Sequence, residues 1–196
     1  MTGRLAAGRL GPSTSGAGLG RDAVERVSRR LVVMRHARAE HSAPTDHVRA
    51  LADRGRSDAE AAGRRLREHG LAPDAVLVSD ALRTRQTWEH VALGAGWDED
   101  LADFSEALYA AGTDSAFDLL RETDASVRTL VVIGHNPTMA SLAELVDDGE
   151  GDAAATTGML TRGFPTAAVA VFTVECVWAD LGPGRARLDA FHLGDA

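Results

Sequence analysis

The sequence predicts one α/β domain built in three layers, α/β/α, around a mostly parallel central sheet. Apolar segments alternate along the chain with segments of helical spacing, the pattern of helices packed on both faces of a sheet. Two of the apolar segments, 31–34 and 130–133, contain no polar residue, as expected of strands buried on both faces. Each leads into a histidine, His36 and His135, and parallel sheets bind ligands at this end of their strands. We therefore expect the two histidines to share one pocket.

Composition and charge narrow the class of protein. The 196 residues are 44% hydrophobic, which is enough for one substantial core. A net charge of −8 disfavours non-specific binding of nucleic acid, although a few arginines can still form a local anion site. The single cysteine, Cys176, excludes an intrachain disulfide, fits a reducing cytoplasmic compartment and is expected to be a buried, inert thiol. We expect no membrane span and no signal peptide, because no apolar stretch has the required length or position.

The amino-terminal part of the chain divides into an extension, the first strand and a polar loop. Residues 1–28 are rich in Gly, Ser, Ala and Arg and lack a sustained apolar period. We expect a flexible extension there, followed by a domain that spans residues 29–196. Residues 37–50 are polar and follow the first strand, where a loop of this length often covers a site. We expect this loop to be the main lid of the pocket, and a modest one.

A helix, a strand and a second helix are predicted next. Small and apolar residues at helical spacing predict a helix over 53–69, which Gly70 ends. Residues 75–78 predict a second buried strand. Ser79 or Asp80 is expected to cap the helix that follows this strand.

The middle of the chain predicts a further strand and two further helices. Residues 101–109 are compatible with a short strand, and Thr113 with the cap of the helix after it. The strand over 130–133 comes next. Asn136 is then a good N-cap, and Pro137 a good first helical residue.

The last part of the chain predicts two more strands. Residues 147–163 are rich in Asp, Gly, Ala and Thr, and we expect a mobile connection there. The apolar run over 167–174 predicts a strand, and Gly-Pro-Gly at 182–184 predicts a turn. Residues 187–193 predict the last strand, placed at an edge of the sheet.

Charged and titratable side chains gather at the predicted carboxyl edge of the sheet. Arg35 and His36 end the first strand, Arg83 lies in the first turn of a helix, and His135 follows another strand. Helical side chains lean toward the amino terminus, so Arg83 should reach back over the strand end. Two arginines can bind the oxygens of a phosphoryl group, and helix amino termini favour anions. A neutral histidine can accept the phosphoryl group, and a second, if protonated, can stabilise its charge.

Three segments, in order, resemble the motifs of the histidine phosphatase superfamily, the phosphoglycerate mutase-like enzymes. Residues 34–37 resemble its Arg-His-Gly signature, and residues 79–87 resemble its Ser-x-x-x-Arg-x-x-Gln-Thr segment. Residues 134–137 resemble the motif of its second histidine. Within the superfamily, the short chain and residues 46–51 and 164–167 are most similar to the SixA branch of phosphohistidine phosphatases. The resemblance implies a phosphoglycerate mutase-like fold and a phosphatase that uses neither a metal nor a cofactor.

The resemblance also implies a role for each matching residue. His36 would be the nucleophile that becomes phosphohistidine, and Arg35 and Arg83 would bind the phosphoryl oxygens. His135 would complete the pocket, and Arg49 matches a further arginine of the SixA branch that faces the phosphate. The implied substrate is a phosphorylated molecule, with a phosphohistidine-bearing protein favoured over metabolites.

Two positions depart from the pattern of the superfamily. Ala37 replaces the glycine that usually follows the nucleophile, and alanine disfavours a positive φ. No carboxylate matches the proton donor clearly, so Asp46, Glu106 or no acid at all stay open. We take Asp46 as the working candidate. A phosphohistidine leaving group is protonated easily, which makes a strong acid dispensable.

Other functions remain to be weighed against this prediction. A metal site could draw on His36, His41, Asp46, His47 and His135, but no pair has metal-binding spacing on one element, and Arg35 would repel a cation. A small-molecule phosphatase or a mutase of the same superfamily is the nearest alternative. A catalytically weak module that only binds phosphorylated ligands is the alternative from another class.

Overall fold

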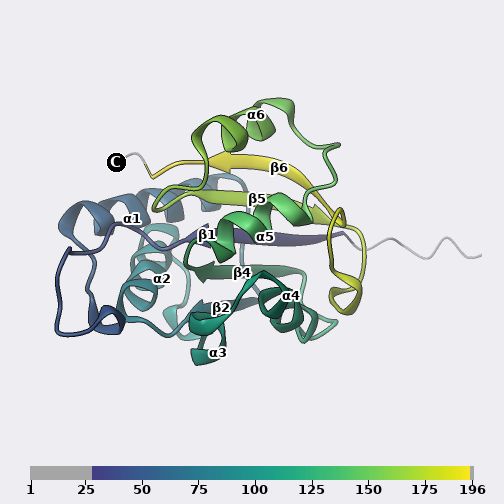
Figure 1. The fold of residues 1–196 in the computed structure, drawn as a ribbon. Coiled ribbons are helices and arrows are strands. Elements are labelled where there is room, and N and C mark those ends of the chain that lie inside the picture. Colours follow the sequence, from purple (N-terminus) through teal and green to yellow (C-terminus); the bar gives the residue numbers. More distant parts are fainter. Residues whose placement is uncertain (1–27, 195–196) are drawn as a thin grey trace, which may run out of the picture.

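The structure, a computed structural model, describes residues 28–194 and contains one six-stranded sheet of order β3-β2-β4-β1-β5-β6 (Figure 1). Its first four strands in this order pair in parallel, and β5 and β6 pair antiparallel. The predicted mostly parallel sheet is therefore confirmed, with the last strand at an edge. Most of the predicted extension, residues 1–27, lies outside the described residues. The strands are β1 (Arg29–Arg35), β2 (Ala75–Ser79), β3 (Ala102–Ser105), β4 (Thr129–Gly134), β5 (Val169–Val174) and β6 (Ala186–His192).

Helices cover both faces of the sheet (Figure 1). Side chains of α1 and α2 share a core with one face, and those of α4, α5 and α6 share a core with the other. The three predicted layers are therefore present. The helices are α1 (Asp53–Glu68), α2 (Leu82–Ala95), α3 (Glu106–Ala110), α4 (Thr113–Arg121), α5 (Thr138–Val146) and α6 (Ala153–Arg162), with 3-10 turns η1 (Asp46–Val48), η2 (Glu99–Leu101) and η3 (Trp178–Asp180). No helix within residues 28–194 is long and apolar enough to cross a membrane.

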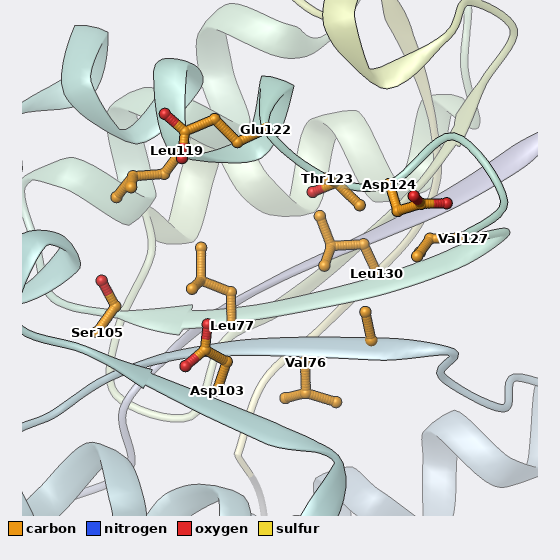
Figure 2. Close-up of a pocket in the computed structure, with 11 residues that line it drawn as sticks. Val76, Leu77, Asp103, Ser105, Leu119, Glu122, Thr123, Asp124, Val127 and Leu130 are labelled. Carbon is orange, nitrogen blue, oxygen red and sulfur yellow. The ribbon is translucent and has the colours of Figure 1, made fainter.

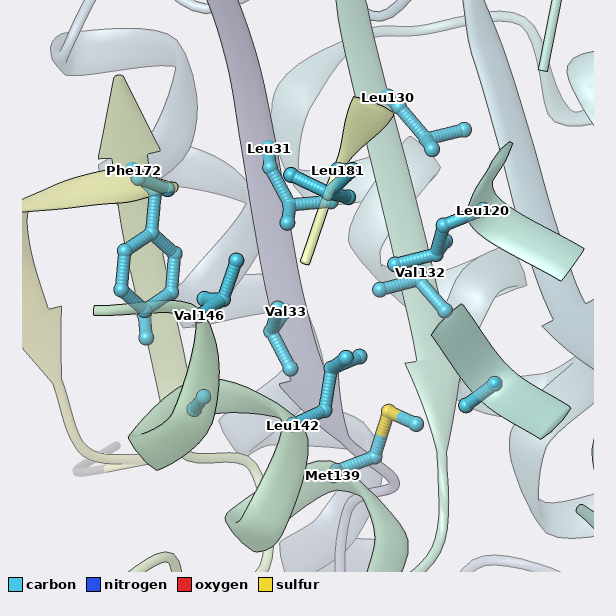
Figure 3. Close-up of a cluster of buried hydrophobic side chains, with 14 of the residues drawn as sticks. Leu31, Val33, Leu120, Leu130, Val132, Met139, Leu142, Val146, Phe172 and Leu181 are labelled. Carbon is cyan, nitrogen blue, oxygen red and sulfur yellow. The ribbon is translucent and has the colours of Figure 1, made fainter. Parts of the chain in front are cut away.

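Strand β1 is buried on both faces, as its apolar run predicts. Leu31 and Val33 point into the core beneath α4 and α5 (Figure 3). Val32 and Met34 contribute to the core of α1 and α2 on the opposite face. All four side chains are fully buried, and each contributes roughly 1.5–3 kcal/mol of hydrophobic stabilisation. This burial fixes the end of β1, and with it the position of His36.

Helices α1 and α2 touch through their backbones. A Cβ atom on Gly63 of α1 would lie 2.1 Å from the carbonyl oxygen of Val91, and one on Gly94 of α2 would lie 2.1 Å from that of Glu60. Only glycine fits at such an approach, because the other residues carry a Cβ. The contact holds the amino terminus of α2, where Arg83 lies, in a fixed place.

The predicted caps of two helices are wrong. Ala81 is the N-cap of α2, and Ser79 and Asp80 bind histidines instead of the helix end. Pro137 is the N-cap of α5, because the side chain of Asn136 donates to the carbonyl oxygen of Phe164. In both places a polar side chain next to the pocket serves a tertiary contact rather than its own helix.

Three further predictions are corrected. Thr113 is the first residue of α4, whose N-cap is Gly112. The expected mobile connection over 147–163 contains helix α6, which Asp152 caps by accepting a 2.7 Å hydrogen bond from the N–H of Ala155. Cys176 is partly rather than fully buried, and burial raises the pKa of its thiol. The composition of residues 147–163 concealed the apolar side of α6, which packs beside β6.

Candidate active site

His36 follows directly from β1, and its side chain is buried. Its Nδ1 lies 2.8 Å from the carbonyl oxygen of Ala37. A carbonyl oxygen only accepts, so Nδ1 carries the proton and Nε2 keeps a free electron pair. Burial, together with the charges of Arg83 and Arg35, lowers the pKa of His36 to about 4, although the bond to Ala37 opposes this. His36 is therefore a neutral, nucleophilic imidazole at neutral pH.

His135 follows β4, and its ring centre lies 5.1 Å from that of His36, so the two histidines share one pocket. Its Nδ1 lies 3.2 Å from Nη2 of Arg83, which can only donate. Its Nε2–H therefore donates to the hydroxyl oxygen of Ser79 at 2.7 Å. Burial and the charge of Arg83 lower the pKa of His135 to about 3. His135 is therefore neutral at neutral pH, and its Nδ1 faces Nη2 of Arg83.

Arg35 and Arg83 supply buried donors to the same pocket. Nη1 of Arg35 donates to the carbonyl oxygen of Phe164 at 3.1 Å, and its Nε is buried without a hydrogen-bond partner among the described residues. Arg83 lies in the first turn of α2, and its Nε has no partner in this part of the chain either. Buried N–H groups are almost always paired, so these two donors beside His36 can supply hydrogen bonds to an anion.

Asp46, in the lid, contacts Arg83 directly. Nη1 of Arg83 donates to the backbone oxygen of Asp46 at 2.7 Å, and Nη2 donates to its Oδ2 at 2.9 Å. Nε of Arg49 donates to Oδ1 at 2.9 Å. Burial raises the pKa of Asp46. The hydrogen bonds and the charge of Arg83 lower it by more, so its pKa lies below the ordinary value. The carboxyl group is therefore ionised in the free protein, which disfavours it as a proton donor.

Glu106 and Arg49 are placed differently by the structure. Glu106 begins α3, is exposed, and its carboxylate has no hydrogen-bond partner in the described part of the chain. Arg49 lies in the lid, where it also donates to the backbone oxygen of Glu40 at 3.1 Å. Its charge contributes to the lowered pKa of His36, so Arg49 lies within electrostatic reach of that ring.

Tyr109 and Thr87 are site residues that sequence reasoning missed. Tyr109 of α3 donates to Oδ2 of Asp46 at 3.1 Å, and its ring packs edge-on against His135 at 5.4 Å. Thr87 accepts the N–H of Ala37 at 3.0 Å and donates to the carbonyl oxygen of Arg83 at 2.6 Å. Thr87 belongs to the segment that resembles the superfamily motif, which was the signal available. Tyr109 had none, since a short helix with no charge pattern brings it to the pocket.

Ala37 fits its position without backbone strain. Among the described residues other than glycine, only Ala167 has a positive φ. The side chain of Ala37, next to His36 in the chain, is fully buried. The departure from glycine therefore leaves the loop after His36 intact.

Two other observations bear on alternative sites. No group of three or more His, Cys, Asp or Glu side chains among residues 28–194 is arranged to hold a metal ion. A hollow of about 480 Å³ lies on the sheet between β3 and α4 (Figure 2). Leu77, Asp103 and Leu130 line it, and neither histidine of the pocket does.

Together these features define a class of protein. A neutral histidine with a free Nε2 lies beside two arginines with unpaired buried donors, at the carboxyl edge of an α/β sheet. Such a site can bind a tetrahedral anion and offer a nucleophile to it. That is the chemistry of phosphoryl transfer.

Comparison with known proteins identifies the family. Residues 31–109 match the histidine phosphatase superfamily (branch 1). An uncharacterized protein of Mycobacterium tuberculosis is 38% identical over 161 residues, which are 82% of this chain and 99% of that protein. One of Mycobacterium leprae is 32% identical over 165 residues, with 82% and 99% covered. The chain belongs to the histidine phosphatase superfamily.

Comparison with solved structures indicates the branch of the superfamily to which the chain belongs. A protein of Nakamurella multipartitia, provisionally named phosphohistidine phosphatase SixA, is 34% identical with a TM-score of 0.74, covering 86% of this chain and 98% of that one. A protein of Agrobacterium tumefaciens, also provisionally named SixA, is 29% identical with a TM-score of 0.67, covering 84% and 97%. The chain is of the SixA type, and its superfamily together with these SixA-type neighbours supports a phosphatase.

Proposed function

We propose that this phosphatase works in two steps through a covalent phosphohistidine at His36, without a metal ion. Nε2 of His36 attacks phosphorus, and the bond to the leaving group breaks with its electron pair on that group. Water then attacks phosphorus, releases inorganic phosphate and restores His36. Throughout, the carbonyl oxygen of Ala37 holds the proton at Nδ1, so that Nε2 always faces the phosphoryl group.

The observation that carries this proposal is the state of His36 beside two arginines. Its pKa of about 4 keeps the ring neutral and nucleophilic at neutral pH. The buried Nε groups of Arg35 and Arg83 are free to bind phosphoryl oxygens, whose charge they would stabilise in the transition state. His135 would hold Arg83 in position for this task.

For the substrate, we propose phosphohistidine on a partner protein. The SixA-type neighbours support this class. The small lid supports it too, because the loop between Ala37 and Ala50 carries one short 3-10 turn and no longer helix. A lid of this size would let a folded partner domain bring a phosphorylated side chain to His36.

The proposal is tested by hydrolysis of p-nitrophenyl phosphate in excess EDTA, with vanadate as an inhibitor that mimics phosphate. Activity should persist in EDTA and fall with vanadate. Rapid quenching should trap a phosphorylated protein whose label maps to His36. Loss of all activity in EDTA, restored by a divalent ion, would contradict the mechanism.

Three substitutions rank the residues in the same assay. His36→Ala should abolish turnover and labelling, since it removes the nucleophile. Arg83→Ala and His135→Ala should each lower kcat/KM on the order of 10²-fold, because preorganised charge stabilisation contributes about this much. Circular dichroism controls for folding. Near-normal turnover by His36→Ala would end the proposal, and a parallel screen of metabolite phosphates against a phosphohistidine peptide tests the substrate class.

A further inference from the structure

The carboxylate of Asp46 lies in the lid of the pocket and has an acceptor position for one further hydrogen bond. Its side chain is 56% exposed. Oδ2 accepts from both Arg83 and Tyr109, whereas Oδ1 accepts from Arg49 alone among residues 28–194. A carboxylate offers about four acceptor positions, so Oδ1 can take one further hydrogen bond from a ligand.

The surroundings of Asp46 keep it ionised. Arg49 approaches from its own loop, Arg83 from α2 and Tyr109 from α3. Its neighbour His47 is held away from the carboxylate by a 2.7 Å bond to Asp80. With two arginines in contact, Asp46 can accept a proton-bearing group but has no proton of its own to give.

Aromatic rings line the path from the nucleophile to this carboxylate. The rings of His36 and His135 are 5.1 Å apart, those of His135 and Tyr109 are 5.4 Å apart, and those of Tyr109 and His47 are 5.1 Å apart. This row of four rings runs from the floor of the pocket to the lid. A flat aromatic leaving group can pack against Tyr109, which is partly exposed and lies next to the carboxylate of Asp46.

We propose that Asp46 and Tyr109 form the leaving-group subsite, where the carboxylate accepts a hydrogen bond from the distal ring N–H of a substrate phosphohistidine. The inference rests on the proposed function. The P–N bond breaks, its electron pair stays on the ring nitrogen, and phosphorus bonds to Nε2 of His36. Because the distal nitrogen already carries a proton, imidazole leaves neutral. Asp46 thus holds a proton on the substrate instead of donating one.

The subsite would also select against other substrates. An alkyl phosphate leaves as an alkoxide, which needs a proton from an acid, and an ionised Asp46 supplies none. Phosphohistidine meets both a carboxylate and an aromatic ring, and needs no acid. The subsite therefore explains, from this chain's own residues, why phosphohistidine would be preferred over sugar phosphates.

The test compares Asp46→Asn with the wild-type protein on a phosphohistidine peptide, phenyl phosphate and p-nitrophenyl phosphate. Asparagine keeps the shape and removes the charge. We expect kcat/KM for the peptide to fall about ten-fold or more beyond any change on the two aryl phosphates, since hydrogen bonds to charged groups contribute this much. This extra loss should grow as pH rises and the substrate ring loses its proton. The ratio between the aryl phosphates should stay as in the wild type.

Two outcomes would overturn the subsite. A larger loss on phenyl phosphate than on p-nitrophenyl phosphate would make Asp46 a proton donor, because the poorer leaving group needs one more. Equal losses on all three substrates would make Asp46 structural. Failure of the proposed function is seen separately, as a wild-type protein that neither hydrolyses p-nitrophenyl phosphate nor labels His36.

Matched variants separate the subsite from general effects on the lid. Asp80→Asn makes the same acid-to-amide change at the residue that holds His47, and should reduce turnover of the three substrates in equal proportion. Tyr109→Leu removes the ring, and Tyr109→Phe keeps it. Leucine should therefore lower the preference for the peptide more than phenylalanine does. The reverse order would contradict a packing role for the ring.

Discussion

At the scale of single residues, the pocket depends on histidines that carry no charge. In each ring, one hydrogen-bond partner decides which nitrogen carries the proton. The carbonyl oxygen of Ala37 can only accept from His36, and the guanidinium of Arg83 can only donate to His135. Burial then disfavours the protonated ring, which the neighbouring arginines would repel further. His36, the proposed nucleophile, therefore needs no base to activate it.

This state of the histidines is measurable by NMR titration of the ring signals in phosphate-free buffer. We expect the transitions of His36 and His135 near pH 4 and pH 3, so both stay neutral at pH 5 and above. Signals are assigned by their loss in His36→Asn and His135→Gln. A transition near 6.5 for either ring would show that the pocket leaves the histidine unperturbed.

Several residues of the pocket were identifiable from sequence because each is tied to a strand end. Arg35, His36 and His135 follow apolar runs, and a parallel sheet brings such ends together. The state of Asp46 was not, since its proton affinity depends on Arg83 and Tyr109, which are distant in the chain. Tertiary contacts of this kind leave no local pattern.

At the scale of elements, the pairing of α1 with α2 limits what the chain tolerates. Gly63→Ala places a methyl group where the carbonyl oxygen of Val91 lies, so the helices must separate. We expect a loss of roughly 1–3 kcal/mol in the free energy of unfolding, measured by urea denaturation, as for other overpacked sites. Gly182→Ala is the control, because the nearest atom to its added methyl group is Nη2 of Arg121 at 3.5 Å, an ordinary van der Waals contact. Equal effects of the two substitutions would contradict the close approach.

The elements themselves were predictable where the apolar period was strong, and less so at their ends. Strands β1 and β4 and helix α1 follow their patterns. The predicted N-caps were wrong where the side chains of Ser79 and Asn136 hydrogen-bond to other parts of the fold. Helix α6 was not predicted, because its buried residues are Ala155 and Met159 alone, which are too few to give a recognisable helical spacing of apolar residues.

At the scale of the whole molecule, the neutral histidines link the pocket to stability. Both pKa values lie below the ordinary 6.5, so the unfolded chain binds more protons than the folded one from pH 6.5 down to about 4. The free energy of unfolding therefore falls as pH drops through this range. Aspartates with lowered pKa act only at lower pH, near their ordinary 3.8 and below.

Urea unfolding at pH 7 and pH 5 measures this link. His36→Asn removes one of the two histidines with a lowered pKa. Between pH 7 and pH 5, the free energy of unfolding of this variant should therefore fall by about 2 kcal/mol less than that of the wild type. Parallel losses in both proteins would show that His36 titrates alike in the folded and the unfolded chain.

The central position of β1 has a consequence for synthesis on the ribosome. This strand is made first among the described strands, yet its two partners, β4 and β5, follow much later; Arg30 and Thr173, which hydrogen-bond, are 143 positions apart. Until they emerge, the four apolar residues from Leu31 to Met34 have no sheet to join. Contacts of such sequence separation slow folding and expose strands to aggregation. A nascent chain that stops before Val169 should therefore bind chaperones, and phosphatase activity should appear only after β5 has left the exit tunnel.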